Sequence, residues 1–121
     1  MMDEVPVLDR AVIESLRQLT PPGEPDVLAE VLELFLVEVP PRINRLRNAW
    51  AGRNIQEVSR AAHSLKGSAG NIGAKRLMGV CRELDEMARA GSLANSAPLV
   101  DALGIEFGHV EAEIRGLIGH S

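Results

Sequence analysis

The sequence predicts an all-α fold, an antiparallel bundle of amphipathic helices, and three observations support this. Apolar residues recur at steps of three and four along most of the chain, which is the period of a helical face. No segment shows the alternation of a half-buried strand. Aromatic residues make up only 2% of the 121 residues, so the core must be aliphatic, which suits packed helices. The length favours one domain over residues 1–121.

The first expected helix follows Asp9, a residue type that commonly caps helix N-termini. Its apolar seam consists of Val12, Leu16 and Leu19. The segment Thr20-Pro21-Pro22-Gly23 should end this helix. Residues 1–7, which precede it, are expected to form a short flexible N-terminus.

The second expected helix carries the longest apolar seam and contains two prolines. Its seam consists of Leu28, Leu32, Phe35, Val39, Ile43, Leu46 and Trp50. Pro40 and Pro41 remove backbone donors and clash with the preceding turn, so a kink or a short break is expected there. Because the seam keeps its phase across both prolines, a kink is favoured. Gly52 should end the helix.

Three further helices complete the bundle. Asn54 followed by Glu57 resembles a capping box and opens a helix to about Gly70. The next extends from Ala74 to about Arg89, and its seam is Leu77, Val80 or Cys81, Leu84 and Met87. After a loop at 91–95, Ser96 should cap the last helix, whose seam is Leu99, Leu103, Phe107, Val110, Ile114 and Leu117. Short loops between such helices imply antiparallel neighbours.

Charge and cysteine content exclude several classes of protein. The net charge is −4 and basic residues are scattered, which argues against nucleic-acid binding. The single Cys81 cannot form an intramolecular disulfide and is interpreted as a small core residue. Residues 1–10, with Pro6, do not resemble a signal peptide. The most apolar stretch, 27–39, contains three glutamates and is too short for a bilayer. A cytoplasmic protein without membrane contact is expected.

The segment around His63 carries the chemical signal. On a helix at about 100° per residue, one face would be buried, consisting of Val58, Ala62, Leu65, Ala69 and Ile72. His63 lies about 160° from Leu65 and is therefore expected to point to solvent. A core histidine satisfied by hydrogen bonds is disfavoured at this position.

Two glycines share the exposed face with His63. Gly67 lies about 40° from it and Gly70 about 20°. Each glycine inside a helix costs about 1 kcal/mol relative to alanine, and on a solvent face neither improves core packing. We therefore expect another surface to approach the backbone closely beside the imidazole. Lys66, about 60° round from His63, places a cation near the same spot.

An exposed imidazole beside an ammonium group suits phosphoryl transfer. Neutral imidazole is a nucleophile near pH 7, and phosphoryl transfer mainly requires positioning and charge stabilisation. On this hypothesis His63 accepts the phosphoryl group, Lys66 neutralises its oxygens, and Gly67 and Gly70 give the partner access. The sequence shows no glycine-rich nucleotide loop, no acidic cluster for Mg²⁺ and no metal-ligand set. It predicts a phosphotransfer intermediate rather than an autonomous enzyme.

The same residues resemble a known family. His63-Ser64-Leu65-Lys66-Gly67-Ser68-Ala69, followed by Ile72-Gly73-Ala74, resembles the signature of histidine-containing phosphotransfer (HPt) domains. Further similar positions are Leu8-Asp9, Leu34-Phe35-Leu36 with Pro40, Ala61-Ala62, Leu77, Cys81 and Leu84. The resemblance covers residues 8 to 90, and the last expected helix carries no family signature beyond its periodicity.

The resemblance implies an up-down four-helix bundle with an additional N-terminal helix, which agrees with the helices expected above. It also implies a relay through phosphohistidine between aspartates in the receiver domains of a hybrid sensor kinase and of a response regulator. The receiver would supply Mg²⁺, and this chain would hold no cofactor. Asp85 stands where relatives often carry Glu or Gln, near the back of the histidine.

Several residues are assigned supporting or structural parts. Ser68 and Asn71 offer hydrogen-bonding groups beyond the histidine, and Ser59 and Arg60 flank it on the preceding turn. Arg53, Arg60, Arg76 and Arg89 could help to dock an acidic receiver surface, but solvated charges are the default interpretation for each of them. His109 and His120 are interpreted as structural or solvated.

Two alternatives belong to other functional classes. One is an adaptor that binds a receiver domain without transferring phosphate. The other is the phosphoacceptor fragment of a larger chemotaxis-type histidine kinase, in which an ATP-binding domain would follow. Because the chain starts at Met1 and ends at Ser121, it reads as complete, and a free-standing monomeric relay protein is preferred.

Overall fold

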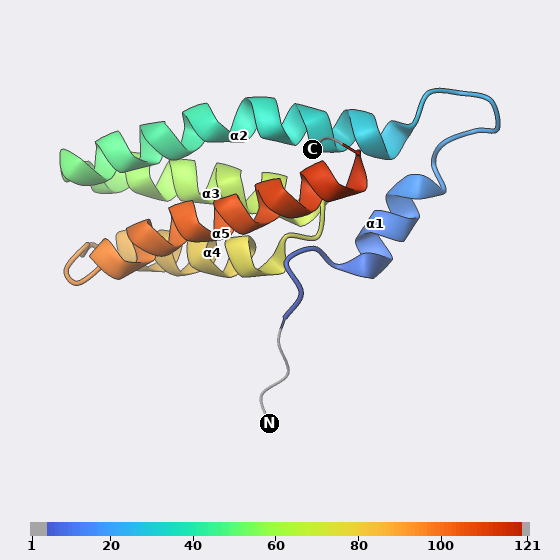
Figure 1. Ribbon diagram of the computed structural model, residues 1–121. Coiled ribbons are helices and arrows are strands. Elements are labelled where there is room, and N and C mark those ends of the chain that lie inside the picture. The colour runs from blue at the N-terminus through green and yellow to red at the C-terminus, as the bar shows by residue number, and fades with distance from the viewer. Residues whose placement is uncertain (1–4, 120–121) are drawn as a thin grey trace.

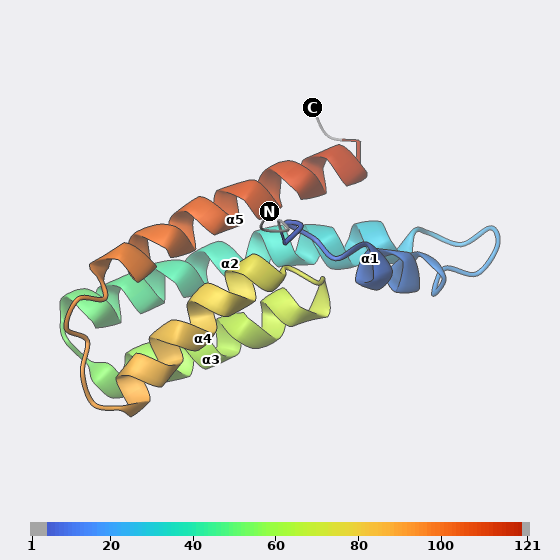
Figure 2. The same cartoon turned by 90° about the horizontal axis from the view of Figure 1, so that it is seen from below.

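The computed structural model describes residues 5–119, and these form five helices and no strand. The helices are α1 (Arg10–Arg17), α2 (Val27–Ala51), α3 (Ile55–Asn71), α4 (Lys75–Arg89) and α5 (Ala97–Leu117). In Figures 1 and 2, α2 to α5 lie side by side and alternate in direction, while α1 lies at one end of the bundle. The predicted up-down four-helix bundle with an additional N-terminal helix is confirmed. Among residues 5–119, no helix is both long and apolar enough to cross a bilayer.

The bundle core is built from the predicted seams of its helices. The buried seam residues are Leu28, Leu32, Phe35, Val39, Ile43, Leu46, Leu77, Cys81, Leu84, Leu103, Val110 and Ile114. In α4 the seam passes through Cys81, which is fully buried, and not through Val80. Phe35 and Phe107 stack between α2 and α5 with ring centroids 6.1 Å apart. Aliphatic packing of this kind supplies the main driving force for assembly.

Helix α2 continues through both prolines. The break that they were expected to allow is absent, and the helix extends without interruption from Val27 to Ala51. Pro40 and Pro41 leave the carbonyls of Leu36 and Val37 without their usual donors. Val37 is 71% exposed, so water can satisfy that side of the helix. Gly52 forms the C-cap, as predicted.

Two predicted seam residues are exposed, and both lie at helix ends. Leu19 is 62% exposed because α1 already ends at Arg17, so the residue falls outside the helix. Ile13 instead supplies the buried position of α1. Leu117 is 39% exposed because it is the last residue of α5, beside the groove between α1 and α5. Trp50 is only half-buried.

The helix caps differ in how closely they follow the prediction. The Asn54 side chain accepts from the N–H of Glu57 at 3.1 Å and caps α3 as expected. The reciprocal bond of a capping box is not formed, because the Asn54 N–H donates to the Ala49 carbonyl at 2.8 Å. Ser96 stands at the N-cap of α5, but its side chain does not cap the helix. Its hydroxyl donates to the Leu93 carbonyl at 2.5 Å and accepts from Trp50 Nε1 at 2.7 Å. The loop at 90–96 is thereby tied to the end of α2.

The turn between α3 and α4 anchors the N-terminal segment. Gly73 adopts a φ of +72°, and its carbonyl accepts from the N–H of Asp9 at 2.9 Å. The Asp9 side chain caps α1 through the N–H of Ala11, as predicted, and pairs with Lys75 at 2.8 Å. The bond with Lys75 is the chief reason that the pKa of the Asp9 carboxyl lies below its ordinary value. Leu8 is buried, whereas residues 1–4 of the expected flexible N-terminus, and His120, lie outside the described residues.

Candidate functional site

His63 projects from the middle of α3, on the side away from the core. The residues predicted to form the buried face of this segment are all buried: Val58, Ala62, Leu65, Ala69 and Ile72. They hold α3 against α4 and α2, the two helices with which it packs most extensively. The His63 side chain is 64% exposed. An imidazole so placed is open to a second molecule.

A single carboxylate lies behind the imidazole. Asp85 Oδ2 on α4 is 3.9 Å from Nδ1 of His63, and the Asp85 side chain is only 6% exposed. Its other oxygen, Oδ1, accepts from the Ser59 hydroxyl at 2.6 Å and from Arg89 Nε at 3.0 Å. These two bonds fix the carboxylate with one oxygen turned toward His63. Nδ1 then faces the protein, and Nε2 is left on the outer side of the ring.

The electrostatics of Asp85 follow from these contacts. Burial is the largest single influence and raises the pKa of its carboxyl, but the hydrogen bonds from Ser59 and Arg89, together with nearby positive charge, hold the pKa below its ordinary value. Arg89 and His63 add smaller contributions in the same direction. Asp85 is therefore ionised at neutral pH and able to stabilise positive charge on the imidazole.

The two glycines predicted beside His63 differ in their surroundings. No heavy atom lies within 4 Å of where a Cβ would be at Gly67, so this position is open, as expected. A Cβ at Gly70 would meet Met78 Cε at 3.5 Å. Gly70 is therefore covered by a side chain of α4, and the expectation that both glycines form bare surface is wrong for Gly70. The cause is the close packing of α3 on α4, which helix periodicity alone does not reveal.

Lys66 is half-buried on α3 and forms no ion pair with any residue that the structure describes. The positive charge of Lys66 acts on the Cys81 thiol on α4. Burial raises the pKa of the Cys81 thiol to about 12, and the Lys66 ammonium opposes this only in part. Cys81 is thus an unreactive core thiol, which agrees with its interpretation as a packing residue.

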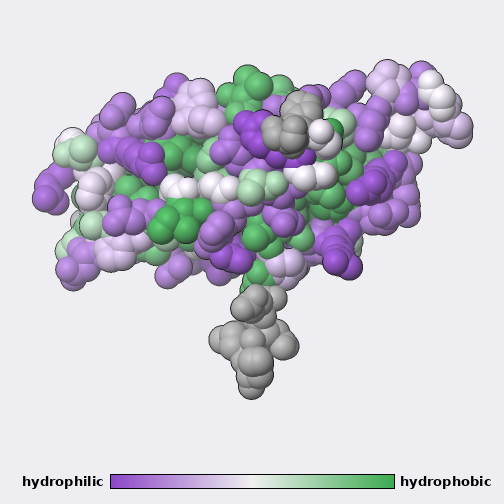
Figure 3. Space-filling view, in the orientation of Figure 1, coloured by the Kyte–Doolittle hydropathy of each residue, from purple (hydrophilic) through white to green (hydrophobic). Residues whose placement is uncertain are grey.

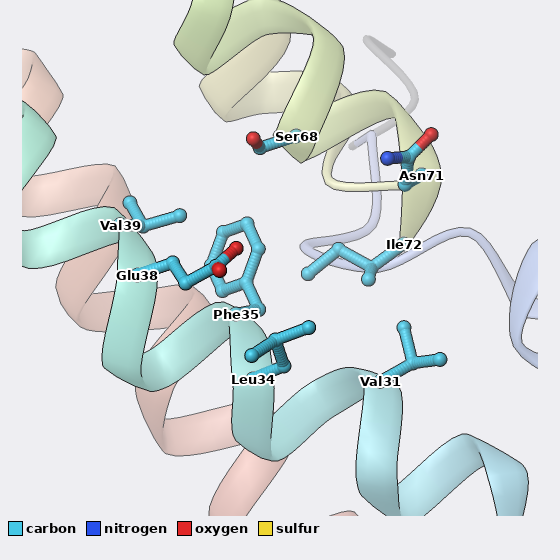
Figure 4. Close-up of a pocket in the computed structure, with 8 residues that line it drawn as sticks. All are labelled: Val31, Leu34, Phe35, Glu38, Val39, Ser68, Asn71 and Ile72. Carbon is cyan, nitrogen blue, oxygen red and sulfur yellow. The ribbon is translucent and has the colours of Figure 1, made fainter.

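Ser68 and Asn71 lie on the side of α3 that faces α2. The Ser68 hydroxyl accepts from Arg42 Nη1 at 2.7 Å, a contact that the sequence gave no reason to expect. Both residues line a small cavity of about 90 Å³ between α2 and α3 (Figure 4), together with Val31, Leu34, Phe35, Glu38, Val39 and Ile72. The structure therefore places these two predicted supporting residues beside a pocket with both polar and apolar lining. Of the predicted supporting residues, Asp85 is the one that it brings against the imidazole.

The surface near this pocket is partly apolar. Figure 3 shows hydrophilic side chains over most of one face, with apolar surface emerging along α2. Leu34 is 54% exposed and Val37 71%. Arg60 is largely exposed on α3 and pairs with Glu57 at 3.6 Å. Such a surface has both apolar and charged contacts to offer a partner.

Sequence reasoning missed the groups that hold Asp85. Ser59 was placed beside His63, and Arg89 was interpreted as a solvated charge. Only the four-residue spacing of Asp85 and Arg89 signals their ion pair. Among the described residues, no group of three or more His, Cys, Asp or Glu is arranged to hold a metal ion. His109 lies near Arg76 and Glu106 on the α4–α5 side and takes no part in the site.

Comparison with known proteins gives consistent matches. The Hpt domain model matches residues 30–117, which include α3, α4 and α5 and most of α2. Histidine-containing phosphotransfer protein 2 of Arabidopsis thaliana is 26% identical over 105 residues, covering 84% of this chain and 67% of that protein. Histidine-containing phosphotransfer protein 5 of the same plant is 34% identical over 74 residues, covering 59% of this chain and 47% of that protein.

A solved structure matches almost the whole chain. Histidine-containing phosphotransfer protein B of Pseudomonas aeruginosa superimposes with a TM-score of 0.87 at 30% sequence identity. The match covers 98% of this chain and 99% of that protein's chain. Because it leaves out so little of this chain, the match includes α1 and the start of α2, which lie outside the matched domain model.

Proposed function

Because this chain belongs to the Hpt domain family, we propose that it relays a phosphoryl group between receiver-domain aspartates through a phosphohistidine at His63. The observation that carries the proposal is the exposed imidazole of His63, whose Nδ1 faces the ionised Asp85 and whose Nε2 faces outward. The partners are the receiver domains of a hybrid sensor kinase and of a response regulator. The chain acts as a cytoplasmic monomer and holds no cofactor of its own.

In the first step, Nε2 attacks the phosphorus of the aspartyl phosphate on the donor receiver. The P–O bond to the aspartate breaks, the carboxylate leaves with the bonding electrons, and an N–P bond forms. The ring then carries positive charge with its proton on Nδ1, and Asp85 stabilises that charge. In the second step, an aspartate of the acceptor receiver attacks the same phosphorus and the N–P bond breaks.

Two further groups support the transfer. The Lys66 ammonium neutralises charge on the phosphoryl oxygens, and open Gly67 lets the partner approach the backbone. Mg²⁺ belongs to the receiver, whose carboxylates supply the oxygen ligands that this ion prefers. Ser68, Gly70, Asn71 and Arg60 support the surface around the histidine.

The test is a phosphotransfer assay with phosphorylated receiver domains from the same organism. Wild type should acquire acid-labile, alkali-stable label, His63→Gln should acquire none, and Lys66→Ala should acquire it more slowly. Label retained in His63→Gln would refute the assignment of the phosphoacceptor. Receiver binding without any label would favour the adaptor over the relay.

A further inference from the structure

A cleft lined by arginines opens between α2 and α3 beside the histidine. Its volume is about 360 Å³, and its lining residues are Arg42, Arg45, Glu57, Arg60, Ala61 and Ser64. It is separate from the pocket beside Ser68, and the hydrogen bond from Arg42 to Ser68 lies between the two. The groove between these helices thus has one part with mixed polar and apolar lining and another part lined by arginines.

The charges in the cleft are not balanced. Arg42 is held by Ser68 and pairs with Glu38 at 3.7 Å, and Arg60 pairs with Glu57 at 3.6 Å. Arg45 is exposed and has no ion pair or hydrogen bond among the described residues. The cleft therefore carries local positive charge in a chain whose net charge is −4.

The cleft borders the surface that a transfer partner must cover. Arg60 lies one turn before His63 on α3, about 60° round the helix, and Ser64 follows His63 directly. A protein that brings a phosphoaspartate to His63 therefore lies close to Arg60 and Ser64, which line the same cleft as Arg45 on the neighbouring helix. Its phosphorylation site is rich in carboxylates, because such side chains hold Mg²⁺.

We propose that this cleft receives acidic side chains of the receiver domain and orients it over His63. The inference rests on the proposed function, since it assumes that the partner is a receiver. Guanidinium groups bind carboxylates with two parallel hydrogen bonds, which fix orientation as well as proximity. Complementary charge also speeds diffusional encounter, and this effect weakens as salt screens it. Arg45 is the group in the cleft that is available without breaking an internal ion pair.

The experiment compares Arg45→Glu with Arg10→Glu, which makes the same change of charge on an exposed residue of α1. For each protein, kcat/KM for transfer from a phosphorylated receiver is measured at several salt concentrations. Each value is divided by the rate at which phosphoramidate, a small phosphodonor, labels the same variant. This ratio removes any change in the reactivity of His63 itself.

We expect Arg45→Glu to lower the ratio about tenfold at low salt and to flatten its salt dependence, with Arg10→Glu close to wild type. Equal ratios for the two variants would overturn the docking role and leave the relay intact. Receiver affinity, measured by titration in a His63→Gln background, separates the two proposals further. Binding that weakens with Arg45→Glu while wild type accepts no label would support the cleft and refute the relay.

Discussion

At the scale of single residues, the proposed site combines the exposed imidazole of His63 with a buried carboxylate behind it. Asp85 has a short side chain, and its Oδ2 remains 3.9 Å from Nδ1 of His63. Ser59 and Arg89 compensate by fixing the other oxygen. If Oδ2 and Nδ1 move closer as positive charge develops on the imidazole, the interaction between Asp85 and His63 becomes stronger during transfer than at rest.

We therefore expect Asp85→Asn to slow transfer from a receiver about tenfold, the effect of losing about 1.4 kcal/mol of stabilisation from a charged hydrogen bond. The ring nitrogens of His63, followed by ¹⁵N NMR, should show a smaller population with the proton on Nδ1. Glu86→Gln, an exposed neighbour on α4, is the matched control. Unchanged transfer in Asp85→Asn would mean that the carboxylate only supports the fold.

Replacing Gly67 by alanine should affect stability and phosphotransfer in opposite directions. A methyl group there meets no heavy atom within 4 Å, so Gly67→Ala should stabilise the protein by about 1 kcal/mol in urea denaturation. The same methyl group displaces the partner, so transfer should slow on the order of tenfold or more. Gly108→Ala, on α5 and equally open, should stabilise without slowing transfer. If Gly67→Ala transfers as fast as wild type, partner access does not require the glycine.

At the scale of helices, the α3–α4 turn determines where α1 lies. Gly73 has a φ of +72°, and a Cβ there would approach the Cβ atoms of Asp9 and Val12 to 2.9 Å. The turn is therefore restricted both by its own conformation and by the segment packed on it. Gly73 belongs to the Ile72-Gly73-Ala74 segment that resembles the HPt signature, and its role in this turn is structural.

Gly73→Ala should cost more than the 1–2 kcal/mol typical of a left-handed conformation, because the methyl group also pushes α1 away. Gly91→Ala is the control, since Gly91 has a φ of +85° but no heavy atom near the added Cβ. Hydrogen exchange should show lost protection in α1 with α2 to α5 retained. A cost no greater than that of Gly91→Ala would argue against close packing at this turn.

At the scale of the whole molecule, the helices and the exposed position of His63 were predictable because both follow from periodicity along one segment. Errors occurred where the apolar periodicity continues to or past a helix end, as at Leu117, the last residue of α5, and at Leu19, beyond the end of α1. Contacts between helices could not be predicted. Ser59 with Asp85, and Arg42 with Ser68, each join residues 26 apart in sequence, and their pairing depends on how neighbouring helices are aligned. The position of the Met78 side chain beside Gly70 likewise depends on how α4 is aligned against α3.

The hydrogen bond between Trp50 and Ser96 also has a practical use. Trp50 is the one tryptophan of the chain and there is no tyrosine, so a single indole dominates its ultraviolet emission. That indole lies where the end of α2 meets the loop before α5, half-buried and bonded through Nε1. Its fluorescence therefore reports whether the end of α2 and the start of α5 are packed together at this end of the bundle. The protein carries its own optical probe of folding, on a residue outside the proposed phosphotransfer surface around His63.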